Sequence, residues 1–501
     1  MNLSAKVRTI KNGGTAHLGD IPLLPIDDFC QTILDAIDHG WRVASYFGVP
    51  QGDEVTLFVV LGYKVEGIIA LLRSVVKEQF PSLALLCPQL QLFEREIWEE
   101  CGITPEGHPW LKPLRFIPDA RTGIRPLPGV MEQYRVTGDE IHEVAVGPVH
   151  AGIIEPGHFR FQCHGEEVFH LEISLGYQHR GIEARVVGGP YPATLFQMEA
   201  AAGDTTIGHT QAHCMIMESL TGRRVPHRGE ALRGIALELE RLANHTGDLG
   251  AIAGDVGYLP TASFCGRIRG EFLNMTALLC GSRFGRGMLR PGGTGFDLGD
   301  RQREELLQRL ETARRDLTIA VNLLWSAPSV MARLEKTGTV SLKDAREIGL
   351  VGPALRACGE ARDVRKEYPF GIYRTRQLPV AIATTGDVHA RALIRWREAE
   401  HSLDFIRELL GELPRGATRS GPHASSPPAP EMLCVAFTEG WRGPICHVAL
   451  TDTHGLFRKY KITDPSFHNW SGLALAMRNQ QISDFPLCNK SFNLSYCGFD
   501  L

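Results

Sequence analysis

Residues 176–183 read Gly-Tyr-Gln-His-Arg-Gly-Ile-Glu, and this stretch is the most informative one in the sequence about the fold. It brings the imidazole of His179, the guanidinium of Arg180 and the carboxylate of Glu183 within five residues. Such a group can relay protons when it is partly buried, because burial raises the pKa of a carboxyl group towards neutrality. A solvated polar turn is the simpler interpretation of these eight residues taken alone.

Further motifs lie on both sides of this stretch. In chain order they are GPVHAG at 147–152, GDTTIGHTQAHC at 203–214, RPGG at 290–293, DPSFHNW at 464–470 and DFPLCNKSFNLSY at 484–496. The motif at 203–214 contains an aspartate, two histidines and a cysteine and could suggest a metal site, but its spacing is unlike that of a zinc motif. It instead predicts a helix that begins just after Asp204 or Thr205, with one of these two as the cap.

Taken together and in this order, the motifs resemble the large subunit of group 4, energy-converting nickel-iron hydrogenases. That subunit is homologous to the 49-kilodalton subunit of complex I, and the resemblance covers roughly residues 140–501. Upstream, FEREIWE at 93–99 and EGHP at 106–109 resemble the 30-kilodalton subunit of complex I. The chain is therefore similar to a fusion of both subunits, as in large subunits of the formate-hydrogenlyase type.

We predict an α+β fold with a small α/β domain over residues 1–118, a linker over 119–140 and a large, mainly helical domain with small β-sheets over 141–501. A helix at 26–39 and a β-branched strand at Val55–Leu61 support the first domain, whereas the apolar run 65–76 fits either a strand or a buried helix. Proline and glycine between 118 and 138 favour a linker.

In the second domain, apolar residues at helical spacing predict three long helices. These helices cover residues 232–242, 306–324 and 390–410. Two β-like segments, 434–438 and 446–451, flank a glycine-containing turn. A polar stretch at 412–431, rich in serine and proline, predicts an exposed loop.

Hydrogenases of this family hold nickel and iron with two Cys-x-x-Cys pairs, because these metals need soft thiolate ligands. The positions that correspond to the four ligands are occupied by Ala202, Thr205, Ser495 and Gly498. The resemblance therefore implies that this chain holds no nickel-iron centre and has no hydrogenase activity. The pattern is most similar to hydrogenase-related complexes that have lost the metal ligands.

Complex I keeps this fold without the metal and uses the vacated space as a quinone pocket. The histidine that holds the quinone headgroup matches His150, whereas no tyrosine stands in 196–203, where the family's second quinone ligand would fall. The resemblance thus implies His150 and His209 as cofactor-binding residues, with a quinone as the molecule bound. It implies no metal ligand on this chain.

Other functional residues of the family correspond by position to residues of this chain. The family's proton-transfer glutamate matches Glu183, and the arginine that overhangs the hydrogenase metal matches Arg442 in Glu-Gly-Trp-Arg-Gly. A guanidinium and an imidazole in a dry cavity can stabilise an anionic intermediate or supply its proton. A plain salt bridge is the alternative for Arg442. The predicted catalytic residues are His150, His179, Arg180, Glu183, Arg442, His447 and Asp464.

Composition narrows the class of protein further. The chain has 501 residues, 43% of them hydrophobic, and a net charge of −4, which gives no reason to expect nucleic-acid binding. No run approaches the ~20 apolar residues of a membrane span, and the N-terminus has no apolar signal region. The 12 cysteines include no Cys-x-x-Cys pair, so we expect buried free thiols in a reducing cytoplasm, not a zinc or iron-sulfur site.

The resemblance implies a peripheral subunit on the cytoplasmic side of a membrane. Its expected partners are an iron-sulfur subunit similar to the 20-kilodalton subunit of complex I, a ferredoxin-like subunit and membrane subunits related to antiporters. The chain itself would bind no cofactor except a quinone, and electrons would come from a [4Fe-4S] cluster in the iron-sulfur subunit.

A scaffold subunit without a catalytic step and a nickel-iron hydrogenase with altered ligands are the alternatives. The sequence leaves open the electron donor and acceptor, the ion pumped and the role of residues 1–118.

Overall fold

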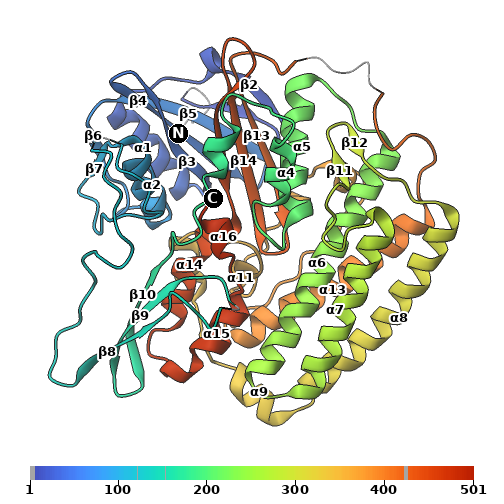
Figure 1. The fold of residues 1–501 in the computed structure, drawn as a ribbon. Helices are drawn as coiled ribbons and strands as arrows, with labels where there is room; N and C mark the ends of the chain where they lie inside the picture. The colour runs from blue at the N-terminus through green and yellow to red at the C-terminus, as the bar shows by residue number, and fades with distance from the viewer. Residues whose placement is uncertain (1–5, 121, 153, 422–426) are drawn as a thin grey trace.

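The computed structural model describes residues 6–120, 122–152, 154–421 and 427–501. Its first sheet lies in the N-terminal region and is antiparallel in the order β1 (Arg8–Ile10), β5 (Ile68–Val76), β4 (Glu54–Tyr63), β3 (Arg42–Gln51). Helices α1 (Ile26–Asp38) and α2 (Gln91–Cys101) pack against it (Figure 1). The helix predicted at 26–39 and the strand predicted at 55–61 are confirmed, and the run at 65–76 forms the strand β5.

From 107 to 140 the described residues form neither helix nor strand, and this segment follows the short parallel pair β6 (Gln79–Pro81) and β7 (Thr104–Glu106). A three-stranded antiparallel sheet comes next, in the order β10 (Glu167–Ser174), β9 (His158–His164), β8 (Ile141–Val146). It projects from the lower left of the molecule (Figure 1). The absence of regular structure in the described part of 119–140 fits the predicted linker, but the division into domains stays a prediction.

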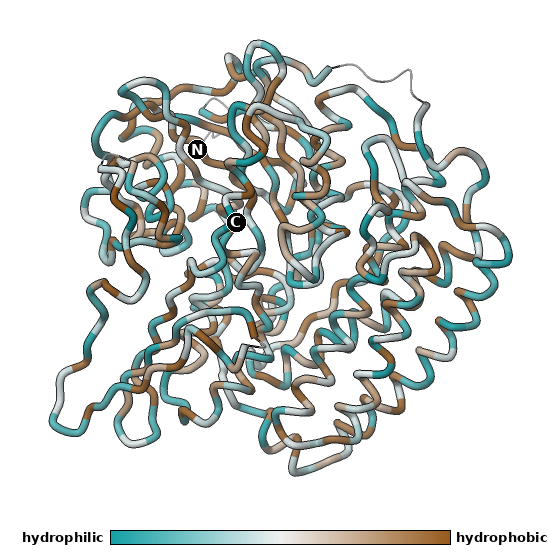
Figure 2. Tube along the Cα trace, in the orientation of Figure 1, coloured by the Kyte–Doolittle hydropathy of each residue, from teal (hydrophilic) through white to brown (hydrophobic). Residues whose placement is uncertain are grey.

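The helical part is a bundle of α6 (His227–Asp255), α7 (Leu259–Cys280), α8 (Asp300–Trp325) and α13 (Val388–Gly411). The predicted helices at 232–242, 306–324 and 390–410 are confirmed as parts of α6, α8 and α13. Hydrophobic and hydrophilic residues alternate along these helices (Figure 2), because one face of each helix packs in the core and the other faces outward. No single helix among the described residues has the length and hydropathy of a membrane span; α8 and α9 (Pro328–Leu334) together do, by length and composition only, across an 80° bend.

A third sheet joins the two ends of the chain. Its order is β15 (Phe457–Thr463), β14 (Gly443–Thr451), β13 (Met432–Gly440), β2 (Thr15–His17), so the predicted strand pair is confirmed as β13 and β14. The edge strand β2 comes from the N-terminal region, and the side chain of Asn12 donates to the backbone oxygen of Phe437 and accepts from its N–H. No motif in the sequence predicts this pairing of β2 with β13. It makes the N-terminal region part of the same folded body.

The remaining helices and strands surround this sheet. They are α3 (Ile182–Val186), α4 (Thr194–Glu199), α5 (Thr206–Thr221), β11 (Leu289–Arg290), β12 (Gly293–Thr294), α10 (Leu342–Glu347), α11 (Gly352–Arg356), α12 (Val364–Glu367), α14 (Pro465–Ala476), α15 (Phe485–Phe492), α16 (Tyr496–Phe499) and the 3-10 helices η2 (Leu18–Asp20), η3 (Pro88–Leu90), η4 (Gly371–Arg374) and η6 (Ile482–Asp484). Helix α5 packs on β13 and β14, and β14 is buried along its whole length. These elements confirm the α+β class.

A buried ionic cluster fixes the bundle to the strands and helices beside it. The carboxylate of Glu238 in α6 accepts hydrogen bonds from Arg241 at 3.0 Å, Arg365 at 3.0 Å, the Tyr373 hydroxyl at 2.6 Å and the Ser402 hydroxyl at 2.6 Å. Burial opposes the charged form, but the two guanidinium groups lower the pKa of Glu238 to about 2. Glu238 is therefore ionised at neutral pH.

Replacing Glu238 by glutamine should lower the free energy of unfolding by about 3–5 kcal/mol, because two buried guanidinium groups lose one of the carboxylates that compensate their charge. Urea denaturation of the full chain, followed by the helical circular dichroism signal, measures the change. Glu305→Gln, which removes an exposed partner of Arg309 in α8, is the matched control and should cost less than about 0.5 kcal/mol. Equal losses in the two variants would contradict this account.

Candidate functional site

The stretch 176–183 wraps around the C-terminus of the chain. The carboxylate of Asp500 accepts the backbone N–H of Gly176 at 2.7 Å and of Gln178 at 2.9 Å, and the His179 Nδ1 lies 3.2 Å from the Asp500 backbone oxygen. Burial raises the pKa of Asp500 to about 6, although the two N–H groups and Arg115 oppose the rise. The stretch is thus half-buried against a titratable carboxyl group and is not a solvated turn.

Arg180 joins two segments that are far apart in the sequence. Its Nη1 donates to the backbone oxygen of Ala200 at 2.6 Å, and its Nη2 donates to those of Ala201 at 2.7 Å and Cys497 at 3.2 Å. The first segment leads into α5 and the second is α16, so Arg180 holds together the two regions that correspond to the hydrogenase metal ligands. It acts as a positioning residue.

Glu183 lies in α3 and faces β15. Its Oε1 accepts from the Lys461 Nζ at 3.1 Å and from the Ile462 N–H at 2.8 Å. The same Lys461 ammonium donates to Glu96 of α2 at 2.5 Å. Glu183 therefore connects the C-terminal region to the N-terminal one through a shared lysine.

Three carboxylates of this cluster, from Glu96, Glu100 and Glu183, approach within 4.8 Å of one another. Three cations match them: Lys461, Lys459 at 2.8 Å from Glu100, and Arg115, which pairs with Glu96. The charges of the cluster are thereby balanced by its own side chains.

Arg442 forms a two-point ion pair with Asp204, at 2.7 and 2.8 Å. Its Nε donates to the backbone oxygen of Asn493 at 2.5 Å, and its guanidinium lies 3.8 Å from the centre of the Trp441 ring. The salt bridge proposed as the alternative for Arg442 is therefore present. It ties the turn between β13 and β14 to the start of α5.

The predicted cap of α5 needs a correction. Thr205 occupies the N-cap position, but its side chain forms no capping bond, and Asp204 is drawn away by Arg442. The carboxylate of Glu240 in α6 caps the helix instead, accepting the N–H of Ile207 at 2.6 Å and of Gly208 at 3.1 Å. A cap from another helix lies outside what local sequence patterns can predict.

A chain of buried hydrogen bonds runs through the centre of the site. His209 lies 3.0 Å from Asp464 through Nε2 and 3.0 Å from His447 through Nδ1. The Tyr460 hydroxyl lies 3.0 Å from both His447 and His213. Asp464 is 1% exposed and His209 is 0% exposed, so no water-sized space adjoins either side chain. Protons can move along this chain by exchange of histidine tautomers.

The electrostatics of this chain keep one end anionic and the middle neutral. Burial, with His209 and His213 nearby, holds the pKa of His447 well below its usual value. Burial opposes ionisation of Asp464, but His209, Arg442 and the Ser466 N–H lower its pKa below the usual range. Asp464 thus carries a negative charge in a dry environment, and His209 separates it from the neutral His447.

His150 stands apart from this chain. It lies in the loop between β8 and β9, half-buried, with its Nε2 2.8 Å from the backbone oxygen of Gly157 and its ring 5.7 Å from that of Phe159. Phe159 in turn meets Tyr496 of α16 edge to face. His150 therefore lies near α16 through Phe159, and it forms no hydrogen bond to His209 or Asp464.

Comparisons with known proteins identify the family of this chain. Residues 28–128 match the family model of the 30-kilodalton subunit of respiratory-chain NADH dehydrogenase, and residues 255–433 match that of its 49-kilodalton subunit. The carbon monoxide-induced hydrogenase of Rhodospirillum rubrum is 33% identical over 70% of this chain and 97% of its own length. This chain belongs to the family of complex I-related hydrogenase large subunits. The resemblance stated from the motifs is thereby confirmed.

Other members of this hydrogenase-related family are similar over much of the chain. Formate hydrogenlyase subunit 5 of Escherichia coli is 28% identical over 84% of this chain and 76% of its own length. A solved chain of the membrane-bound sulfane sulfur reductase, an archaeal respiratory membrane complex, has the same fold, with a TM-score of 0.67 and 24% identity over 72% of this chain and 99% of its own. Like its relatives, this chain is an oxidoreductase subunit.

The residues present do not fit the nickel-iron group of the hydrogenases in this family. A Cβ atom at Gly498 would lie 2.8 Å from the Asp464 Cγ and 2.9 Å from the Ser495 Oγ, closer than side chains tolerate. The Ser495 Oγ caps α16 by accepting the Gly498 N–H, and the Thr205 Oγ1 accepts from Trp441 at 3.1 Å. The space that the second thiolate pair would need is filled by Asp464, and the four positions offer no thiolate.

The structure brings some predicted residues of this hydrogenase relative together and leaves others apart. His209, His447 and Asp464 are joined by hydrogen bonds. The charge of Arg442 lowers the pKa of Asp464. Arg180 donates hydrogen bonds to the segment before α5 and to α16. Sequence analysis did not assign roles to Asp500, Glu240, Tyr460 or His213. Of these four, only His213 could have been predicted from the sequence to lie near His209, because it follows His209 by one helical turn and shares its helix face.

The raised pKa of Asp500 can be tested through the pH dependence of stability. A carboxyl group whose pKa rises from 3.8 to about 6 on folding stabilises the chain at low pH, and this stabilisation is lost as pH rises through 6. Asp500→Asn cannot ionise, so its stability relative to the natural chain should increase by on the order of 2 kcal/mol between pH 4.5 and 7.5. Urea denaturation at both pH values measures this, with Asp53→Asn at an exposed turn as control. A constant difference between Asp500→Asn and the natural chain would contradict the assignment.

Proposed function

We propose that this chain is the peripheral subunit, on the cytoplasmic side of a membrane-bound complex, at which electrons from a [4Fe-4S] cluster of an adjacent subunit reduce a quinone or a similar acceptor. The proposed partners are an iron-sulfur subunit similar to the 20-kilodalton subunit of complex I, a ferredoxin-like subunit and antiporter-related membrane subunits. The chain would not be a hydrogenase. The observation that carries the proposal is the buried Asp464–His209–His447–Tyr460 chain, which fills the region where the hydrogenases of the family hold their metals.

The proton chemistry follows from the charges of that chain. Reduction of a quinone adds negative charge, which raises the pKa of nearby carboxylate and imidazole groups and favours proton uptake. Asp464 is anionic and His447 is neutral before reduction, so both are able to accept a proton. Arg442, which Asp204 holds in one orientation, would stabilise the anionic reduced acceptor. The membrane subunits would use this change of charge to move an ion.

The half-buried stretch 176–183 is the proposed entry for protons. Asp500 has a pKa of about 6 and therefore exchanges protons near neutral pH, and His179 lies against its backbone. Arg180 contacts Cys497 in the same short helix that ends just before Asp500. Glu183 would tune this entry through Lys461. His150, in the loop beside Tyr496, would contact the acceptor.

A scaffold subunit without a catalytic step is the second candidate function. It is favoured by the burial of His209 and Asp464, whose hydrogen bonds are already made within the chain. An acceptor would need to displace one of these partners before it could touch Asp464. In this alternative the site is a hydrogen-bonded core that replaced a metal.

Asp464→Asn separates the two candidates, because asparagine keeps the size of the side chain but removes its negative charge. In the assembled complex, the variant should slow reoxidation of the reduced [4Fe-4S] cluster by decylubiquinone at least about tenfold, a loss typical of removing a proton-transfer group. Electron paramagnetic resonance of the cluster follows the rate. Asp404→Asn, on the exposed side of α13, is the matched control. An unchanged rate in a fully assembled Asp464→Asn complex would favour the scaffold.

Nickel content tests the exclusion of hydrogenase activity. The complex purified from cells grown with nickel should contain no stoichiometric nickel by elemental analysis, because no thiolate stands at the four ligand positions. It should evolve no hydrogen with a reduced viologen dye. A complex with about one nickel per chain would overturn the proposal and favour a hydrogenase with altered ligands.

A further inference from the structure

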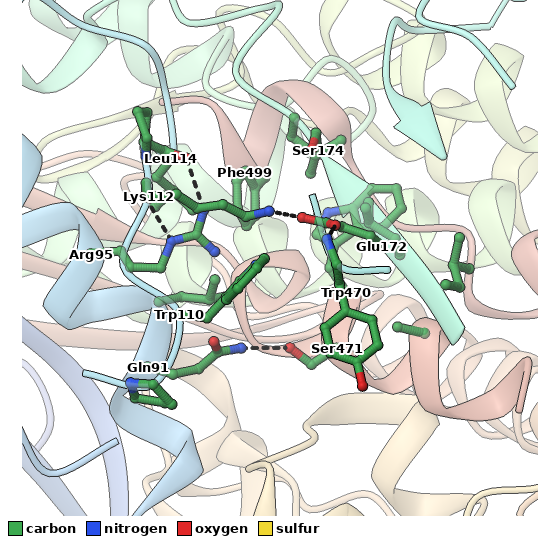
Figure 3. A pocket seen from close by; sticks show the side chains of 18 of the residues that line it. Gln91, Arg95, Trp110, Lys112, Leu114, Glu172, Ser174, Trp470, Ser471 and Phe499 are labelled. Atoms are coloured by element: carbon green, nitrogen blue, oxygen red, sulfur yellow. Dashed lines mark hydrogen bonds and ion pairs between the residues drawn. The ribbon is translucent and has the colours of Figure 1, made fainter. Parts of the chain in front are cut away.

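A cavity of about 380 Å³ lies between the N-terminal region and the C-terminal one, away from the Asp464 site. Helix α2 and residues 109–116 line one side; β10, α14 and α16 line the other (Figure 3). Its volume is in the range of small-molecule pockets, roughly 300–1,000 Å³. The function proposed above makes no use of this cavity.

Two polar bridges cross the cavity and keep it open. Lys112 forms an ion pair with Glu172 of β10, and the Gln91 amide donates to the Ser471 hydroxyl of α14 at 3.3 Å. Figure 3 shows Trp110 between these two bridges. The cavity therefore has fixed polar ends and an aromatic middle.

The middle of the cavity suits a flat, apolar ring. Trp110 and Tyr134 meet edge to face with ring centres 6.2 Å apart, and Trp470 and Phe499 line the opposite wall.

The charge of the cavity suits an anion. Arg95 donates from Nε to the Lys112 backbone oxygen at 2.9 Å and from Nη2 to the Pro113 backbone oxygen at 2.8 Å (Figure 3). No carboxylate of the described residues forms an ion pair with Arg95, whereas Lys112 is neutralised by Glu172. One uncompensated positive charge thus remains among the lining side chains, next to the aromatic walls.

We propose that this cavity binds a small aromatic monoanion, such as an arene carboxylate. Its ring lies between Trp110 and Trp470, and its carboxylate meets the Arg95 guanidinium. The ligand contacts both regions of the chain, and it touches α14, the helix that begins directly after Asp464. It is therefore placed to act on that helix from outside the Asp464 site.

A pair of probes that differ only in charge tests the proposal. The full chain is titrated with 2-naphthoate and with neutral 2-naphthamide by isothermal titration calorimetry. We expect saturable binding of one naphthoate per chain, at least about tenfold tighter than naphthamide, because a charge-assisted hydrogen bond to Arg95 is lost in the amide. Naphthoate should also raise the melting temperature, since it bridges two regions of the fold.

Variants of the chain test whether naphthoate binds in this cavity. Arg95→Gln should reduce the preference for naphthoate to less than about twofold while leaving naphthamide binding unchanged. Arg309→Gln, which removes an exposed arginine of α8 far along the chain, is the control for a lost positive charge. Circular dichroism confirms that each variant is folded.

Three results would overturn the proposal. They are no saturable binding of naphthoate, equal affinity for naphthoate and naphthamide, and an unchanged preference in Arg95→Gln. None of them bears on the reoxidation assay of the Asp464 variant, so this inference and the proposed function fail independently.

Discussion

The contact between the Asp464 carboxylate and the His209 ring is the interaction on which the candidate site depends. A buried carboxylate is tolerated only when hydrogen bonds and opposite charge compensate for its lost hydration. Asp464 obtains this from His209, from the Ser466 N–H that it caps and from the nearby charge of Arg442. One side chain thereby links α5 to the start of α14.

The same requirement for compensated charge explains how the N-terminal region is joined to the rest. Glu96 of α2 shares Lys461 with Glu183, and Arg115 donates to the backbone oxygen of Phe499 at 3.1 Å. Strand β2 extends the sheet that carries His447. The region that resembles the 30-kilodalton subunit is thus bonded to the stretch 176–183 and to the C-terminal helix. A change in its position would alter the surroundings of Asp500 and Glu183.

The motifs selected residues that the structure brings together, but they did not indicate the partners of those residues. His209, His447 and Asp464 were each chosen by correspondence with a family, and they meet in one hydrogen-bonded chain. Glu183 was chosen for proton transfer, and it lies in an ion pair with a lysine that no motif had marked. The sequence allows either a catalytic role or a salt bridge for Arg442. Its two bonds to Asp204 are compatible with both, because a guanidinium held in place still presents its charge to the site.

The sequence by itself determined the family, the α+β class, the long helices and the absence of cysteine from the four ligand positions, because these follow from residue identity and from apolar periodicity along short segments. Only the tertiary structure decided that β2 joins the C-terminal sheet, that Glu240 caps α5 and that Asp464 occupies the space beside Gly498. The physical reason is that such contacts join residues that lie from 32 to more than 400 positions apart in the chain. Their energies depend on burial and on the nearest opposite charge, and neither is encoded in any local pattern.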